Sequence, residues 1–205
     1  MTIRLHRGDL PDLSAYKGAA AIDTETMGLD PRRDRLCVVQ MSPGDGSADI
    51  VQIGAGQKKA PNIERLLADP SIVKIFHFAR FDLAALANAF GVMAGPVYCT
   101  KIASRLARTY TDKHGLKDLA REVLGIDLSK QQQLSDWGAD ALTDAQVSYA
   151  ATDVLHLHAL REKLDAMLAR EGRTELAAAC FRFLPDRARL DLAGWADEDI
   201  FSHSL

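Results

Sequence analysis

An apolar run that ends in two acids constrains this chain more than any other feature of its sequence. Residues 19–22 read Ala-Ala-Ala-Ile, and Asp23, Thr24 and Glu25 follow directly. Such a run predicts a buried strand, and side chains alternate between the two faces of a strand. Asp23 and Glu25 are therefore expected on one face, close enough to bind one cation together.

Two further acids lie in segments that are expected to be helical. Asp82 follows a strand-like run at 72–76, and Asp153 lies four residues after Tyr149. A helix places residues at this spacing on one face, so a phenol is predicted beside a carboxylate. Taken one at a time, such acids are more often turn, cap or solvated residues than metal ligands. Buried together they would repel one another and raise each other's pKa values, unless cations were bound.

The types of ligand indicate which ions would bind. Oxygen ligands without His or Cys favour hard cations, Mg²⁺ or Mn²⁺, over zinc. Two such ions about 3.5–4 Å apart can activate a water and stabilise the leaving oxygen of a phosphoryl displacement. We therefore predict a phosphodiesterase in which two divalent cations are bound by Asp23, Glu25, Asp82 and Asp153. Tyr149 is expected to orient the attacking water, since a phenol with a pKa near 10 is a poor base at neutral pH.

Length and charge restrict what this site could serve. The chain has 205 residues, which suits one well-buried catalytic domain over 1–205. No apolar run approaches the roughly 20 residues of a membrane span, and the N-terminus lacks the apolar core of a signal peptide, so we expect a cytoplasmic protein. The net charge of −3 argues against a protein that coats long nucleic acid. A short substrate, or one local basic patch, remains compatible.

The order of the predicted elements indicates an α/β fold. An antiparallel meander is expected from strands at 19–23, 36–41 and 48–52. It is followed by a helix at 62–67, a strand at 72–76, the helix that carries Asp82, and a short strand at 97–99. Helices dominate after residue 100, and a capping box at 143–146 opens one that runs through Leu164. These elements predict a mixed sheet flanked by helices, with a helical tail at about 171–205 used in packing or assembly.

Three motifs, in their order along the chain, resemble those of the DEDD exonuclease superfamily. They are Asp-x-Glu at 23–25, Phe-His-x-x-x-x-Asp at 76–82 and Tyr-x-x-x-Asp at 149–153, the last typical of the tyrosine subclass. Segments 115–119 and 135–137 add a similarity to ribonuclease D. The resemblance implies a ribonuclease H-like fold and a metal-dependent 3′-5′ exonuclease.

The whole chain is similar to the nanoRNase C group, single-domain enzymes that resemble ribonuclease D. The similarity includes residues 33–40, 99–104, 129–133 and 183–185. It implies hydrolysis of very short RNA, chiefly dinucleotides, to mononucleotides, with DNA as a further candidate substrate, by a homo-oligomer that forms an octameric ring. A general single-strand RNA or DNA exonuclease that trims RNA 3′ ends is the alternative. A catalytically dead binding module is disfavoured, because all four acids and the tyrosine are present.

Five residues around the acids are expected to contact substrate: Thr24, Leu29, His77, Lys130 and Gln131. In oligoribonuclease, another DEDD enzyme, a leucine at the place equivalent to Leu29 wedges between two bases; a leucine packed under a glycine turn is the alternative. His77 could bind the terminal sugar or phosphate, or be a core histidine. Lys130 and Gln131 open a polar loop that could hold a 5′-phosphate. The cations between 101 and 114 are either a phosphate-facing patch or solvated helix surface.

Overall fold

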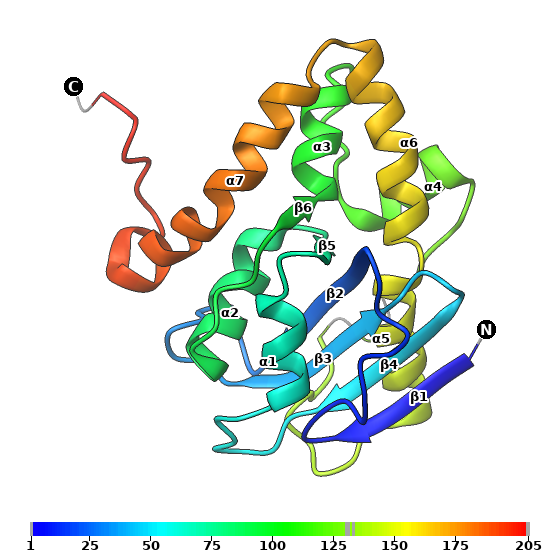
Figure 1. Cartoon of the computed structure of the whole chain (residues 1–205), viewed down its shortest axis with the longest axis vertical. Helices are drawn as coiled ribbons and strands as arrows, with labels where there is room; N and C mark the ends of the chain where they lie inside the picture. The colour runs from blue at the N-terminus through cyan, green and yellow to red at the C-terminus, as the bar shows by residue number, and fades with distance from the viewer. Residues whose placement is uncertain (1, 130–131, 133, 204–205) are drawn as a thin grey trace.

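A six-stranded mixed sheet forms the centre of the molecule and carries helices on both faces (Figure 1). The structure is a computed structural model that describes residues 2–129, 132 and 134–203. The strands are β1 (Thr2–Arg7), β2 (Ala19–Thr26), β3 (Leu36–Ser42), β4 (Ser47–Gln52), β5 (Val73–Phe76) and β6 (Val97–Cys99). The helices are α1 (Pro61–Ala68), α2 (Ala79–Phe90), α3 (Thr100–Ala107), α4 (Leu116–Leu124), α5 (Asp144–Leu155), α6 (Leu157–Arg170) and α7 (Thr174–Leu190), and a short helical segment η1 (Asp191–Trp195) follows. This architecture confirms the predicted fold class.

The strand order places β2, with its acids, in the interior of the sheet. The order is β1-β4-β3-β2-β5-β6. β2, β3 and β4 form the predicted antiparallel meander, while β5 pairs parallel with β2, and β6 pairs parallel with β5. β1 pairs parallel with β4 at the edge and was not predicted, because only part of its surface is buried and its residues alternate with charged ones.

Two hydrophobic cores lie on opposite faces of the sheet, and β2 contributes to both. Ala20 and Ile22 belong to the core shared with α1 and α2, whereas Ala21 belongs to the core shared with α5 and α6. Figure 1 shows α1 and α2 on one side of the sheet and α5 on the other. Because the pleat alternates, Asp23 and Glu25 follow Ala21 to the α5 side and Thr24 follows Ile22 to the α2 side.

The prediction of one continuous helix from 143 to Leu164 is wrong, because the structure has two helices there. Thr143 and Gln146 form the expected capping box, but α5 ends at Leu155 and α6 begins at Leu157. His156 joins them with φ −104° and ψ −4°. The break lets α5 stay on β3 and β4 while α6 packs against α3 and α4. No Gly or Pro marks this position, so tertiary packing rather than local sequence sets it.

The C-terminal segment is attached to the start of α2. Asp191, which is buried, accepts hydrogen bonds from the guanidinium groups of Arg80 and Arg187. Arg80 also donates to the carbonyl oxygen of Ala196. Trp195 and Phe201 nevertheless remain exposed, Phe201 with 75% of its surface. The role of this tail in assembly stays a prediction.

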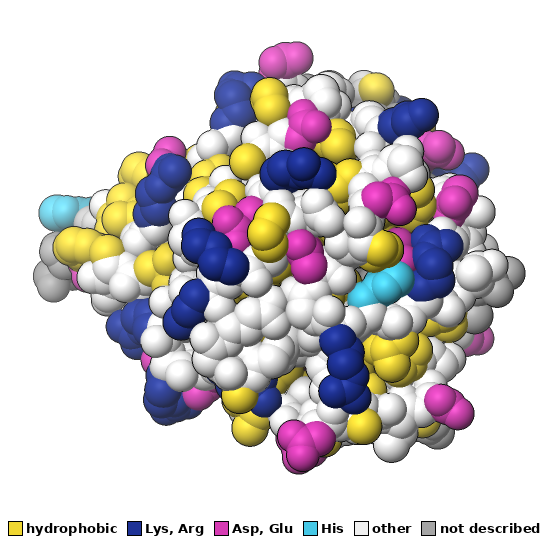
Figure 2. All heavy atoms as spheres, turned by 60° about the horizontal axis from the view of Figure 1, so that its bottom comes forward, with side chains coloured by type: hydrophobic (Ala, Val, Ile, Leu, Met, Phe, Trp, Pro, Cys, Tyr) yellow, Lys and Arg dark blue, Asp and Glu magenta, His cyan; other side chains and the backbone are white. Residues whose placement is uncertain are grey.

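The surface carries both signs of charge side by side. Figure 2 shows Lys and Arg side chains interspersed with Asp and Glu over the face that it draws. Such mixing agrees with the small net charge of −3 and differs from the basic stripe of a protein that binds long nucleic acid. Among the described helices, none combines the length and the apolar character needed to cross a membrane.

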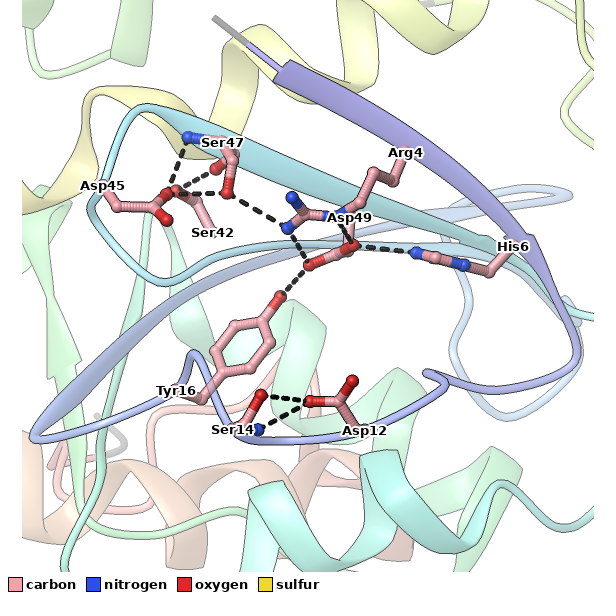
Figure 3. Close-up of polar contacts among 9 residues, drawn as sticks. All are labelled: Arg4, His6, Asp12, Ser14, Tyr16, Ser42, Asp45, Ser47 and Asp49. Carbon is pink, nitrogen blue, oxygen red and sulfur yellow. Dashed lines mark hydrogen bonds and ion pairs between the residues drawn. The ribbon is translucent and has the colours of Figure 1, made fainter.

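A buried carboxylate attaches the edge strand β1 to the sheet (Figure 3). Asp49 of β4 accepts hydrogen bonds from Nε and Nη2 of Arg4, at 2.7 and 2.9 Å, and from the Tyr16 hydroxyl at 2.7 Å. His6 Nε2 lies 2.8 Å from the same carboxylate. Burial opposes ionisation of Asp49, but the hydrogen bonds from Arg4, His6 and Tyr16 outweigh it and lower its pKa to about 2.

We expect Asp49→Ala to lower the free energy of unfolding at pH 7 by about 1–3 kcal/mol, because it leaves the buried Tyr16 hydroxyl and the partly exposed Arg4 without their acceptor. The lowered pKa means that this contribution is present above the unfolded pKa of about 4 and is lost as the pH falls toward 2. Urea unfolding at pH 7 and pH 3 measures both effects. Asp12→Ala is the control, since exposed Asp12 accepts hydrogen bonds from the N–H and the hydroxyl of Ser14, in a turn away from Asp49's hydrogen bonds. An equal loss in both variants would contradict the assignment.

Candidate active site

A cleft of about 600 Å³ opens where β2 ends. Residues of β2, of the loop that follows it, of the turn before α4 and of α5 line the cleft. Asp23, Glu25, Tyr149 and Asp153 are among them, as are the apolar side chains of Leu29 and Trp137. The cleft therefore combines a group of acids with surfaces suited to flat, apolar groups.

Three of the four predicted acids form a cluster. Asp23, Glu25 and Asp153 each offer a carboxylate oxygen, and these oxygens all lie within 4.8 Å of one another. The pleat of β2 presents Asp23 and Glu25 on one face, and α5 covers that face and supplies Asp153. This set of hard oxygen donors is what a Mg²⁺ or Mn²⁺ ion requires.

Asp82 lies beside this cluster rather than within it. It comes from α2, on the other side of the sheet, and is 3% exposed. Its Oδ1 accepts a hydrogen bond of 2.7 Å from the Thr24 hydroxyl. The hydroxyl of Thr24, predicted to contact substrate, is thus directed to a neighbouring acid, although Thr24 also lines the cleft. Asp82 is still near enough to Asp23 for its charge to raise the pKa of that residue.

Burial raises the pKa of all four acids, and the charges of neighbouring acids raise the pKa of Asp23 and Glu25 further. Burial is the largest cause for Asp23, whose pKa rises further through the charges of Asp82, Asp153 and Glu25. The pKa of Glu25 rises to about 8 through burial and then through Asp153 and Asp82. Burial raises the pKa of Asp82 and of Asp153 to about 7, against hydrogen bonds from Thr24 and Tyr149 respectively. The cluster therefore needs positive charge to be fully ionised at neutral pH.

Tyr149 interacts with the cluster as its spacing from Asp153 predicts. Its hydroxyl interacts with the Asp153 carboxylate, and its ring lies 6.1 Å from that of Trp137 between centroids. Burial, followed by the charges of Asp153, Glu25 and Asp23, raises the pKa of Tyr149 far above its ordinary value. The phenol keeps its proton, so it can orient a water molecule but is a poor base.

Gln40 takes part in the site although its role was not predicted. It lies opposite Asp23 in the antiparallel register of β2 and β3, and its Nε2 donates to Asp23 Oδ2 at 2.8 Å. The residue is completely buried, and its Oε1 has no partner among the described residues. A polar residue within the apolar strand 36–41 was the available signal, since a buried amide needs a partner. Which carboxylate it meets depends on the strand register.

Leu29 and His77 both line the cleft. Leu29 has 88% of its surface exposed, so it does not pack under the glycine turn. His77 is partly buried, with Nδ1 2.9 Å from the Thr100 hydroxyl. Burial and then the charge of Lys101 lower the pKa of His77 to about 3, so it is neutral. Lys130 and Gln131, predicted to hold a 5′-phosphate, lie outside the described residues.

The cations between 101 and 114 lie in different environments and do not form one patch. Arg108 is completely buried and pairs with Glu122, so it is not part of a phosphate-facing patch. Lys101 lines the cleft and places its Nζ 4.3 Å from the centroid of the Phe78 ring. Arg105 is exposed and lines a neighbouring cavity instead.

Comparison with known proteins agrees with a nuclease site. A family model described as 3′-5′ exonuclease matches residues 11–169. Ribonuclease D of Gluconacetobacter diazotrophicus is 34% identical over 168 residues, which are 82% of this chain and 42% of that protein. The chain thus spans less than half the length of this curated relative.

Similarity to solved structures extends over the entire chain. The structure of Brucella melitensis NrnC with bound Mg²⁺ is 63% identical, with a TM-score of 0.97 and 100% of both chains covered. The structure of the same protein bound to pGG is 64% identical, again with a TM-score of 0.97 and complete coverage of both chains.

The fold, the acids and the family model together define a nuclease domain. The chain belongs to the 3′-5′ exonuclease family, and within it the chain resembles ribonuclease D over most of its length and NrnC over all of it. The family resemblance predicted from the three motifs is confirmed.

The raised pKa values predict a stability that depends on pH and metal. In a chelator, the native acids retain protons up to about pH 7–8 that the unfolded chain releases near pH 4, so stability falls as the pH rises through this window. Millimolar Mg²⁺ should remove the fall, because it favours the charged carboxylates. Thermal melts from pH 5 to 9, with EDTA or Mg²⁺, measure this; melting temperatures in EDTA that do not fall with pH would contradict it. Asp12→Ala should behave as wild type.

Proposed function

We propose that this protein is a 3′-5′ exoribonuclease that hydrolyses very short oligonucleotides, chiefly dinucleotides, to mononucleotides. The observation that carries the proposal is the cluster of Asp23, Glu25 and Asp153 in a cleft beside the exposed Leu29. Similarity over the full chain to NrnC, whose structures contain Mg²⁺ in one case and pGG in another, supports it.

The residues at the cleft fit two divalent cations. Asp23, Glu25 and Asp153 would bind metal directly, with Asp82 adjacent to Asp23 for the second ion. When bound, the cations supply an activated water and neutralise charge on the phosphate. The buried, crowded acids have raised pKa values, so positive charge at this place relieves the cost of ionising them.

The protein's own side chains then have separate tasks. Gln40 donates to Oδ2 of Asp23 from the neighbouring strand, which fixes the orientation of that carboxylate. The Tyr149 hydroxyl, protonated and beside Asp153, orients the attacking water. Neutral His77 lines the cleft, and in this proposal its imidazole contacts the terminal sugar or phosphate of the substrate.

A preference for dinucleotides follows from how affinity can be obtained here. A long strand gains affinity from many phosphates, whereas a dinucleotide has one bridging phosphate and must rely on its bases. Each base stacked on an apolar or aromatic group contributes about 1–3 kcal/mol. The cleft offers the exposed side chains of Met27, Leu29 and Leu134 for such contacts, and the net charge of −3 offers little to a long polyanion.

A general single-strand RNA or DNA exonuclease that trims RNA 3′ ends is the second candidate. The similarity to ribonuclease D over 82% of the chain favours it. The acid cluster serves both candidates equally, because cleavage chemistry does not depend on substrate length. The dependence of rate on length separates them.

We also propose a homo-oligomer, an octameric ring. The exposed apolar side chains Leu176, Trp195, Ile200 and Phe201 support it, since the described surface leaves them in water in the isolated chain. Light scattering coupled to gel filtration measures the subunit number; a monomer at micromolar concentration would contradict the proposal.

We expect purified protein with Mg²⁺ to cleave 5′-labelled RNA dinucleotides with higher kcat/KM than seven-residue RNA, and to release mononucleotides from the 3′ end. Asp23→Ala and Asp153→Ala should reduce hydrolysis to background. Their melting temperatures in EDTA should not fall below that of wild type, because each substitution removes a charge that repels its neighbours. Asp12→Ala is the matched control. Equal kcat/KM for both lengths would reject the dinucleotide preference in favour of the second candidate.

Tyr149→Phe tests whether the phenol orients the water. The substitution keeps the ring beside Trp137 and removes only the hydroxyl. We expect kcat to fall by about tenfold to a hundredfold, at the low end for groups that assist proton transfer, with the Mg²⁺ concentration for half-maximal rate changed little. A large shift in that concentration would show instead that Tyr149 acts through metal binding.

A further inference from the structure

The exposed Leu29 lies on a loop whose backbone is held by several hydrogen bonds. The loop joins β2 to β3, and its ends are bridged by a hydrogen bond from Met27 N–H to the Arg35 carbonyl at 3.0 Å. The Thr26 hydroxyl donates to the Gly28 carbonyl immediately before Leu29. A leucine with 88% of its surface exposed gains nothing from packing in this chain, so the fixed backbone points to a contact outside the chain.

Asp34 holds the other side of this loop. Its Oδ2 accepts the Asp30 N–H at 3.0 Å, and its own N–H donates to the Asp30 carbonyl at 2.8 Å. The carboxylate also lies against Gly28, where an added Cβ would be 2.2 Å from Oδ2. Only 12% of the Asp34 side chain is exposed. The carboxylate therefore contacts the backbone on both sides of Leu29, at residues 28 and 30.

We propose that Asp34 is a positioning residue that holds Leu29 in the cleft for contact with a nucleobase of the substrate. This rests on the proposed function, because it requires a substrate whose bases reach Leu29. The fixed loop removes the conformational entropy that a free loop would lose on binding. Gly28 is required at its position because any side chain there would displace the Asp34 carboxylate.

The hydrogen bond to the Asp30 backbone, rather than the ion pair with Arg33, is the essential contact. Arg33 donates to both oxygens of Asp34, at 2.7 and 2.9 Å, but its own side chain is 75% exposed. An ion pair at such a surface stabilises little. Asp34→Asn keeps an oxygen that can accept the Asp30 N–H and weakens only the ion pair, so it should act as wild type.

The test compares two substrates in Mg²⁺ or Mn²⁺. The diribonucleotide ApA presents two bases, whereas thymidine 5′-(p-nitrophenyl phosphate) presents one and needs the same acids for hydrolysis. We expect Asp34→Ala to lower kcat/KM for ApA about tenfold, mainly through KM, which is within what one base contact contributes. Its kcat/KM for the nitrophenyl ester should stay within about twofold of wild type. Gly28→Ala should reproduce the loss on ApA.

Two matched variants serve as controls. Asp34→Asn should restore ApA hydrolysis, and Asp12→Ala, which removes a turn-capping aspartate away from the cleft, should leave both substrates unaffected. Three results would overturn the proposal. Asp34→Ala could have the same kcat/KM for ApA as wild type, it could lose kcat/KM equally on both substrates, or Asp34→Asn could lose as much kcat/KM for ApA as Asp34→Ala. Failure of the proposed function has a different signature, because wild type itself would then show no advantage on ApA over seven-residue RNA.

Discussion

The cost of burying several carboxylates close together is the constraint on which the rest of this structure depends. Asp23, Glu25 and Asp153 crowd together at the end of one strand, and Asp82 adds its charge from behind. Burial raises the pKa of each of these acids, and the neighbouring charges raise the pKa of Asp23 and Glu25 further. A chain can maintain such a cluster only if its backbone is fixed by other forces. Here a central strand paired on both sides, and two separate hydrophobic cores, supply them.

The polar contacts around the acids show how their orientation is maintained. Gln40 takes one oxygen of Asp23, Thr24 takes one oxygen of Asp82, and Tyr149 reaches Asp153. Each donor binds one acid, so each of these carboxylates keeps oxygen lone pairs for a ligand. The hydrogen bonds also limit the rise in the pKa of Asp82 and Asp153. Binding sites prepared in this way lose little entropy when a ligand arrives.

Much of the fold and of the site could be predicted because the signals are local. The period of a strand places Asp23 and Glu25 together, and the period of a helix places Tyr149 beside Asp153. The break at His156, the edge strand β1 and the partner of Gln40 depend on packing between distant segments, for which the sequence carries no nearby marker. The position of Asp82 depends on the same kind of information: α2 lies across the sheet from α5, and Thr24 faces it.

The acids of the cleft come from both sides of the sheet, and this has a consequence for the dynamics of the protein. α2 and α5 are packed in different cores, so each could loosen without the other. An ion shared between Asp23 and either helix would add a link between two layers that lie on opposite faces of the sheet. Metal binding in the cleft would then stabilise both layers together. Slow amide exchange and resistance to proteases would appear on both sides of the sheet at once. Loss of activity on warming would accordingly come before global melting, as soon as the weaker layer opened.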